Sequence, residues 1–347
     1  MFFISPLSPD RQPPTLYTVV MSSQLRKDLV SGDWIAIAPN RSNRPGHEII
    51  KNGARKESPL DSCPFEDPQR HGNKEPYFTY GGQDWSLQVL ENKFPAFTHE
   101  HKCVPFEAVG PFTVTGAAGH HDLVITRGHD AAFAHLSAGE ADEVLKAFQE
   151  RYSAYMKDEC LAYVSMFQNW GLTAGASIYH PHYQMMALPV IPPDVMHSLN
   201  GSELFFQKHG QCVHCAMLEW ECGKKIRIVH ENEHAVAYAP FVSKNPYETR
   251  IFPKVHSAYF EDAADVVRHA VAETLQQVLR KMHTRLGDPD YNFFIHTSPM
   301  QDKERYSMYH WHVEIIPKVT RNAGFEFSTG VEINDVDPDD AAALLNS

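Results

Sequence analysis

The chain lacks any long apolar run. No stretch of its 347 residues approaches the roughly 18 consecutive apolar residues that are needed to cross a bilayer. It also lacks an excess of basic residues, since its formal net charge is −12. We therefore expect neither a membrane-embedded protein nor a surface that coats nucleic acid. Any phosphate chemistry must depend on a few local cations and neutral donors.

Cysteine is scarce, with six residues in the whole chain. Cys103, Cys160 and Cys222 follow no spacing that is typical of a disulfide framework, so we expect a reducing, cytoplasmic location. The first 20 residues lack the basic and apolar segments of a signal peptide. We expect residues 1–24 to form a disordered extension.

The segment His180-Pro181-His182 is the strongest candidate for chemistry. Side chains two residues apart in an extended chain share a face, so the two imidazoles would stand side by side. Ser177 and Gln184 are neutral donors that suit phosphate oxygens, and a glycine-containing turn lets the backbone approach a ligand. A nucleophilic site is one interpretation. An ordinary edge strand with a structural histidine, or a simple metal pair, is the other.

A second such pair, His310-Trp311-His312, lies in the C-terminal half, and each pair enters an apolar strand that ends at proline. A histidine precedes each pair by a similar interval. His129 lies 51 residues before His180, and His256 lies 54 residues before His310. The two halves therefore look like an internal duplication.

Each half also contains cysteine in a short segment that we interpret as a hairpin. These cysteines predict metal sites. Cys-x-x-Cys with two distant histidines is typical of tetrahedral zinc. The ligands predicted in the second half are Cys212, Cys215, His256 and His310. A carboxylate replaces one thiolate in the set predicted in the first half: Cys63, Glu66, His129 and His180. The alternatives are a pair of reduced surface cysteines in the second half and an empty first site.

Hydrophobic periodicity predicts an α+β fold. The capping box Ser137-Ala138-Gly139-Glu140 predicts one helix, and a second helix is predicted after Asp262. Their apolar stripes are interpreted as core. Strands are expected over residues 33–38, 162–169 and 291–296. We expect two domains, residues 25–198 and 199–347, built mainly from antiparallel strands.

Three polar residues near predicted strand ends are candidates for substrate binding. Arg41 and Arg44 can clamp a phosphate bidentately, and Asn92 can address a ribose or a base. Two solvated arginines and a turn asparagine that bonds its own backbone are the alternative interpretation.

From about residue 25 to residue 345, the chain resembles the galactose-1-phosphate uridylyltransferase family, within the histidine-triad superfamily. The likeness is most specific over Asn169–Gln184, which includes Asn169, Gly175 and Ser177. It is supported by Arg41, Arg44-Pro45, Asn92-Lys93-Phe94-Pro95, Cys63-Pro64-Phe65, His129 and His310-x-His312. The resemblance implies two duplicated histidine-triad-like domains with a half-barrel sheet flanked by helices, often assembled as a homodimer. It also implies that His182 is the nucleophile, that Gln184 and Ser177 hold the phosphate, and that His180 is a metal ligand.

The activity that this resemblance implies is ping-pong transfer of a uridylyl group from UDP-glucose to galactose 1-phosphate, through a uridylyl-His182 intermediate. One or two zinc ions would be structural, because four protein ligands leave no open position. The second-half Cys-x-x-Cys resembles a branch that includes ADP-sugar and dinucleotide phosphorylases. An adenylyltransferase or phosphorylase is therefore one alternative function. A non-catalytic, zinc-bearing nucleotide-binding protein is another.

Overall fold

The computed structural model describes residues 23–44, 57–82, 84–98, 103 and 105–347. The extension expected over residues 1–24 lies outside this part of the chain, except for its last two residues. Among the described residues, no helix combines the length and the apolar character that a bilayer crossing requires.

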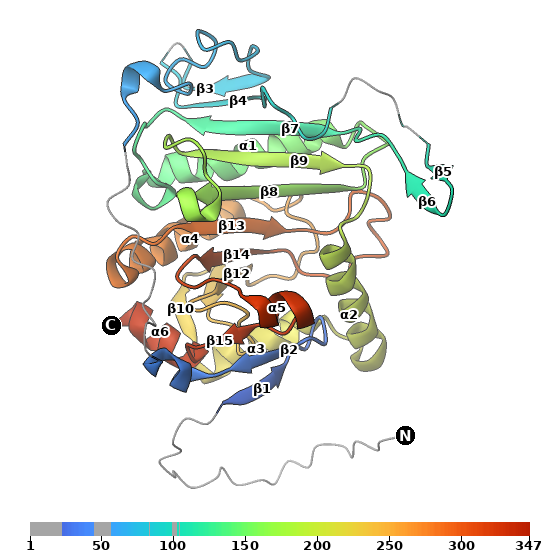
Figure 1. Cartoon of the computed structure of the whole chain (residues 1–347), viewed down its shortest axis with the longest axis vertical. Coiled ribbons are helices and arrows are strands. Elements are labelled where there is room, and N and C mark those ends of the chain that lie inside the picture. The colour runs from blue at the N-terminus through green and yellow to red at the C-terminus, as the bar shows by residue number, and fades with distance from the viewer. Residues whose placement is uncertain (1–22, 45–56, 83, 99–102, 104) are drawn as a thin grey trace, which may run out of the picture.

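One ten-stranded sheet runs through the molecule in the order β10-β11-β12-β14-β13-β8-β9-β7-β4-β3, and neighbouring strands are antiparallel (Figure 1). The first half supplies β3 (Phe78–Tyr80), β4 (Leu87–Glu91), β7 (His120–Thr126), β8 (Tyr163–Trp170) and β9 (His182–Leu188). The second half supplies β10 (Ile228–Glu231), β11 (Ala235–Tyr238), β12 (Thr249–Pro253), β13 (Tyr291–His296) and β14 (His312–Pro317).

The strand order shows the duplication directly. Along the chain, the first half contains β3, β4, β7, a helix, β8 and β9, and the second half contains β10, β11, β12, a helix, β13 and β14. Read inward from either edge of the sheet, the corresponding strands therefore occur in the same order. The central strands β8 and β13 join the halves, with Asn169 opposite Asn292. The two halves thus share one sheet, and residue 198 lies inside the connecting helix α2 (Pro193–His209).

Two long helices cover one face of this sheet. They are α1 (Ala138–Tyr155) and α4 (Asp265–Leu286), and their apolar faces belong to the main core (Figure 1). The predicted capping box is confirmed, since Ser137 and Glu140 bond each other's backbone. Hydrogen bonds also join the two helices, including one of 3.0 Å from Arg268 to Gln149. The expected mixed α+β architecture is confirmed.

Smaller elements complete the structure. A three-stranded sheet contains β1 (Gln24–Lys27), β2 (Trp34–Ile37) and β15 (Ile333–Asn334). The remaining α-helices among the described residues are α3 (Val213–Lys224), α5 (Gly324–Thr329) and α6 (Pro338–Asn346). Short 3-10 turns occur at η1 (Pro39–Asn43), η2 (Leu60–Ser62), η3 (Phe133–His135) and η4 (Leu172–Ala174).

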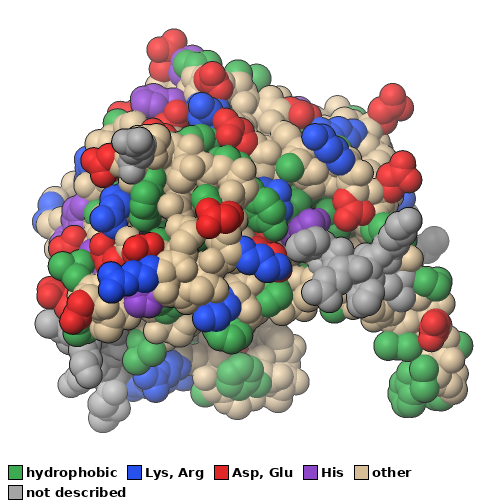
Figure 2. All heavy atoms as spheres, turned by 90° about the horizontal axis from the view of Figure 1, so that it is seen from above, with side chains coloured by type: hydrophobic (Ala, Val, Ile, Leu, Met, Phe, Trp, Pro, Cys, Tyr) green, Lys and Arg blue, Asp and Glu red, His purple; other side chains and the backbone are tan. Residues whose placement is uncertain are grey.

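A separate hairpin of β5 (Glu107–Val109) and β6 (Phe112–Val114) projects from the body, with hydrophobic side chains at its surface (Figure 2). A disulfide between Cys103 and Cys160 connects the segment before this hairpin to the stretch after α1. The spacing of these cysteines did not predict this disulfide. Their sequence separation of 57 residues gave no local signal, and only the fold brings them together.

Candidate functional site

His182 is the first residue of β9 and is 7% exposed. Its Nδ1 donates to the carbonyl oxygen of His180 at 2.9 Å, which leaves the lone pair of Nε2 as the nucleophile of the ring. Burial lowers the pKa of His182 below the usual histidine value, and the bond to the carbonyl opposes this shift in part. The imidazole is therefore neutral near pH 7.

Phe65 forms an aromatic wall behind both histidines. Its ring centroid lies 6.0 Å from that of His180 and 5.1 Å from that of His182, both in edge-on geometry. The two imidazoles therefore stand on the same side of the strand, as the His-x-His spacing predicted. Phe65 is buried, so it keeps water from that side of the site.

Gln184 is bonded to His121, a residue that the sequence reasoning missed. Oε1 of Gln184 lies 2.9 Å from Nε2 of His121. The amide of Ala96 donates to Nδ1 of His121 at 3.1 Å, so the ring proton belongs on Nε2 and is donated to Gln184. This leaves the carboxamide N–H groups of Gln184 free to donate to a ligand. No signal in the sequence marked this contact, because it depends on the pairing of β7 with β9, in which Leu123, two residues after His121, lies opposite Gln184.

Asn92 follows β4 and lies against the same imidazole. Its Oδ1 accepts from the backbone N–H of Phe94 at 2.9 Å, as expected for a turn asparagine. Its Nδ2 lies 3.0 Å from Nε2 of His121, although in the tautomer above both groups are donors and form no hydrogen bond. The ring of Phe94 is 82% exposed beside this turn. It offers an apolar surface on which a base can stack.

The loop before the His-x-His pair is shaped by a residue of the second half. Asn292 on β13 donates to Oδ1 of Asn169 and to the carbonyl of Ala174, each at 2.8 Å. Gly175 follows with a φ of +95°, which favours glycine, and Ser177 is exposed in the same loop. The sequence reasoning identified this loop but missed the role of Asn292.

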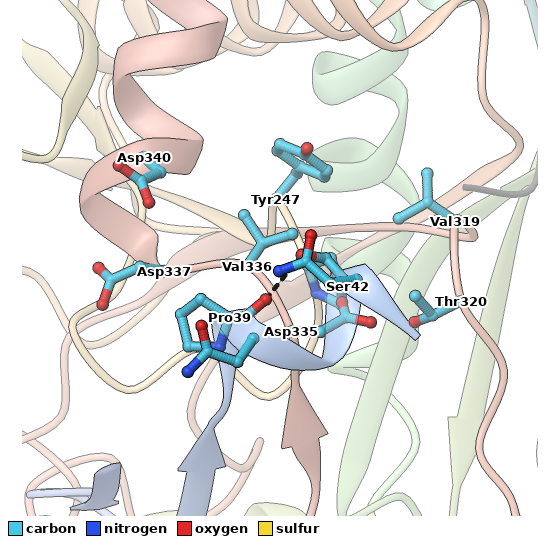
Figure 3. Close-up of a pocket in the computed structure, with 12 residues that line it drawn as sticks. Pro39, Ser42, Tyr247, Val319, Thr320, Asp335, Val336, Asp337 and Asp340 are labelled. Carbon is cyan, nitrogen blue, oxygen red and sulfur yellow. Dashed lines mark hydrogen bonds between the residues drawn. The ribbon is translucent and has the colours of Figure 1, made fainter. Parts of the chain in front are cut away.

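Arg41 and Arg44 lie elsewhere, on or beside η1, and are exposed. This turn borders a cavity of about 530 Å³ whose other lining residues include Tyr247, Val319 and Asp335 of the second half (Figure 3). No contact between the described residues joins either arginine to His182. Within one chain, the structure therefore does not bring these arginines to the candidate nucleophile.

The structure brings together the metal ligands predicted in the first half. Oε1 of Glu66 lies 2.9 Å from Nδ1 of His129 and 3.3 Å from Nδ1 of His180, and the Cys63 sulfur lies 3.6 Å from the latter atom. Nε2 of His129 donates to the backbone carbonyl of Ser58, and Nε2 of His180 donates to that of Thr126. These bonds aim both Nδ1 atoms inward, as in zinc sites.

The second-half set is likewise brought together. The Cys215 sulfur lies 3.3 Å from Nδ1 of His256 and 3.6 Å from Nδ1 of His310. Cys212 is at the N-cap position of α3 and Cys215 lies in the first turn of this helix, so a helix stands where a hairpin was expected. In each set the ligand atoms lie within 4.8 Å of one another, which fits a tetrahedral ion with bonds of roughly 2.0–2.3 Å. Both sets can hold a metal ion.

The second half also contains a counterpart of His182 that was not assigned a role. Nδ1 of His312 bonds the carbonyl of His310 at 3.0 Å, as in the first half. The His312 ring, however, stacks at 4.5 Å on both Phe252 and His296. Together with Glu314, His296 and His312 form a third group of potential ligand atoms. The stacked rings block access to His312.

Comparisons with known proteins agree with this geometry. Residues 66–345 match a family described as Domain of unknown function (DUF4921). The chain is 34% identical over 330 residues to ADP-glucose phosphorylase of Arabidopsis thaliana, covering 93% of this chain and 92% of that protein. It is 24% identical over 331 residues to galactose-1-phosphate uridylyltransferase of Thermotoga maritima, covering 93% and 97%.

Two solved structures are similar over nearly the whole chain. An ADP-glucose phosphorylase from Arabidopsis thaliana with bound ADP-glucose aligns with a TM-score of 0.81 at 31% identity, covering 94% of this chain and 99% of that chain. A uridylyltransferase aligns with a TM-score of 0.71 at 30% identity, covering 93% and 97%.

Proposed function

The chain belongs to the DUF4921 family, which is related to the galactose-1-phosphate uridylyltransferases, and on that premise we propose that it transfers a nucleotidyl group from a nucleotide sugar through His182. The relatives are named as transferases and a phosphorylase, so the chain is a nucleotidyltransferase. The bond from Nδ1 of His182 to the carbonyl of His180 is the observation that carries the proposal, because it frees Nε2 for attack.

In the first step, Nε2 of His182 attacks the α-phosphorus of the nucleotide sugar. A nitrogen–phosphorus bond forms, the bond from that phosphorus to the bridging oxygen breaks, and sugar 1-phosphate leaves with the electron pair. The carbonyl of His180 stabilises the positive charge on the ring through Nδ1. Gln184 and Ser177 donate to the non-bridging oxygens as charge develops.

In the second step, an oxygen of the acceptor attacks the same phosphorus. The nitrogen–phosphorus bond breaks, and its electron pair returns to Nε2, which restores neutral His182. With inorganic phosphate as the acceptor, the product is a nucleoside diphosphate. With a sugar 1-phosphate, the product is a new nucleotide sugar.

We propose ADP-glucose as the donor and inorganic phosphate as the acceptor. The similarity to ADP-glucose phosphorylase supports this choice, at 34% identity over 93% of the chain. The second candidate is uridylyl transfer from UDP-glucose to galactose 1-phosphate, supported by the uridylyltransferase at 24% identity. Both candidates use the same nucleophile and differ in the base.

We propose that zinc occupies the two clusters that contain Cys63 and Cys212. Thiolate and imidazole are the ligands that zinc prefers. The second-half cluster supplies four such ligands, and the first-half cluster supplies three together with the carboxylate of Glu66. A zinc ion with four protein ligands braces the strands and supplies no open position for substrate. His180 would then anchor the backbone carbonyl that orients His182.

The test uses ADP-glucose and UDP-glucose, each labelled in its nucleoside and incubated with the protein without acceptor. Label bound to protein, stable to alkali and located at His182 by peptide mass spectrometry, is the expected result. The His182→Ala variant should bind no label and should keep its zinc. His120→Ala is the matched control, because His120 faces Tyr155 on the opposite side of the sheet and should leave labelling unchanged.

The donor and the class of protein follow from the same experiment. Adenylyl label supports the phosphorylase, and uridylyl label supports the uridylyltransferase. Product formation with undiminished rate in His182→Ala would overturn the proposed mechanism. Absence of both label and product with either donor would identify a non-catalytic binding protein.

A further inference from the structure

A cavity of about 580 Å³ in the second half has no place in the proposed reaction. Its size is typical of small-molecule sites. Large apolar side chains surround it: Leu29, Met217, Trp220, Ile226 and Phe241. Four of these are highly exposed, and Trp220 is 60% exposed. Contiguous exposed apolar surface of this kind marks a binding site more often than a solvated face.

The sheet register places this cavity at the duplicated position of the first-half site. Between β7 and β9, Leu123 pairs with Gln184. Between β12 and β14, which hold the same places in the second half, Arg250 pairs with Glu314. Glu314 therefore corresponds to the phosphate-binding candidate Gln184, and Arg250, which lines the cavity, corresponds to Leu123.

The adjacent strands β4 and β11 extend this match. Leu90 lies opposite Leu123, and Tyr238 lies opposite Arg250. The segment Asn92-Lys93-Phe94 lies two to four residues after Leu90, and the segment Pro240-Phe241-Val242 lies at the same distance after Tyr238. The second of these segments lines the cavity. The cavity is thus lined by the second-half counterpart of the loop that carries the proposed base-binding residues Asn92 and Phe94.

The charge of the lining suits an anion. Four cationic side chains face two carboxylates: Lys27, Lys224, Arg227 and Arg250 against Asp28 and Glu221. The arginines are already bonded, Arg227 to Glu221 at 2.8 Å and Arg250 to Glu248 at 2.9 Å. The two lysines remain for a ligand. Lys224 places its ammonium 4.9 Å from the ring centroid of Trp220, so charge and aromatic surface are adjacent.

Transfer chemistry is not expected here. The ring of His312, the counterpart of the nucleophile, is stacked between Phe252 and His296. Glu314 replaces the neutral carboxamide of Gln184, and its carboxylate is held by Arg250 at 3.3 Å. A carboxylate at that position repels a phosphoryl group that gains negative charge.

We propose that this cavity is a second nucleotide-binding site, which binds without catalysis. The base would stack on the aromatic side chains of Trp220 and Phe241, because base–aromatic stacking tolerates any base. The phosphate would lie at Lys27 and Lys224. The choice of a nucleotide, and not another planar anion, rests on the proposed function of the duplicated site.

Titration of the full chain with ADP by calorimetry tests this proposal. We expect two ADP molecules per chain. Trp220→Ala and Lys224→Gln should each weaken one class of site by about tenfold or more and leave nucleotidyl labelling of His182 unchanged. Phe112→Ala is the matched control for loss of an exposed aromatic ring, since Phe112 lies on the β5–β6 hairpin away from the cavity lining. It should change neither class of site.

The outcomes separate the two proposals. ADP binding that depends on Trp220 supports the second site even if His182 never becomes labelled. A single class of site that is unaffected by both Trp220→Ala and Lys224→Gln overturns it, whatever the result at His182. Unchanged circular dichroism of the two variants would exclude unfolding as the cause of lost binding.

Discussion

The Nε2 atom of His121 lies 2.9 Å from Oε1 of Gln184, and this contact orients the carboxamide that we assign to the phosphate. The orientation follows from the amide of Ala96, which leaves Nδ1 of His121 as an acceptor. His121 is therefore a positioning residue in the proposed reaction. It holds Gln184 with its N–H groups directed away from the imidazole.

His121→Ala should lower kcat for transfer by roughly tenfold to a hundredfold, because the lost hydrogen bond is worth about 1–3 kcal/mol. KM should change less, since the carboxamide acts on developing charge. Steady-state kinetics with the donor identified by labelling measure both constants. His120→Ala, altered one residue away on the opposite face, should keep its kcat. Equal losses in the two variants would show a general effect on β7.

Gly175→Ala should slow transfer and cost about 1–2 kcal/mol of stability, because an alanine at a φ of +95° is strained. Its Cβ would also lie 3.6 Å from Nδ2 of Asn169. Urea unfolding and single-turnover labelling measure the two effects. Gly223→Ala in α3 is the control, where an added Cβ meets nothing within 4 Å and should stabilise the helix. Normal labelling in Gly175→Ala would show that this turn does not position the phosphate-binding loop.

Glu66→Ala should reduce the bound zinc from two ions per chain to one, because it removes a ligand from the first-half cluster. Metal analysis by mass spectrometry gives the stoichiometry. Asp61→Ala is the control, because it removes an exposed carboxylate nearby and should leave the stoichiometry at two zinc ions per chain. One ion per chain in the unaltered protein would contradict a filled first site.

Cys212→Ala should remove the second-half zinc and lower Tm by roughly 10 °C, since a tightly bound ion contributes several kcal/mol. Labelling of His182 should persist below the lowered Tm. Calorimetry with and without a chelator measures the shift. A Tm that the chelator lowers equally in the variant and the unaltered protein would show that Cys212 binds no structural ion.

Cys160→Ser should destabilise the oxidised protein by roughly 4 kcal/mol, because the disulfide closes a loop of 57 residues in the unfolded chain. Urea unfolding with and without dithiothreitol measures this difference, which the reductant should abolish. Cys222→Ser replaces a free thiol and should show no dependence on reductant. A reductant-independent loss in Cys160→Ser would mean that the bond does not form in solution.

Much of the site could be predicted from local spacing. The i, i+2 relationship placed His180 and His182 side by side, and the repeated intervals identified both ligand sets that the fold assembles. The capping box before α1 and the strand over Tyr291–His296 also followed from sequence. These features depend on backbone geometry within a few residues, or on a pattern that occurs twice.

Other features depended on pairings across the sheet. His121 reaches Gln184 only because β7 lies beside β9, and Asn292 reaches Asn169 only because β13 joins the two halves. The Cys103–Cys160 disulfide likewise joins two segments that only the fold brings together.

The sequence by itself determined the chemistry available to this protein: which side chains can attack phosphorus, bind zinc or cap a helix. The tertiary structure alone decided how the two His-x-His pairs differ, since the ring of His312 is stacked between Phe252 and His296. The reason is physical. Composition and spacing fix the chemical type of each group, whereas its solvation and its partners, which set its reactivity, depend on residues that are distant in the chain.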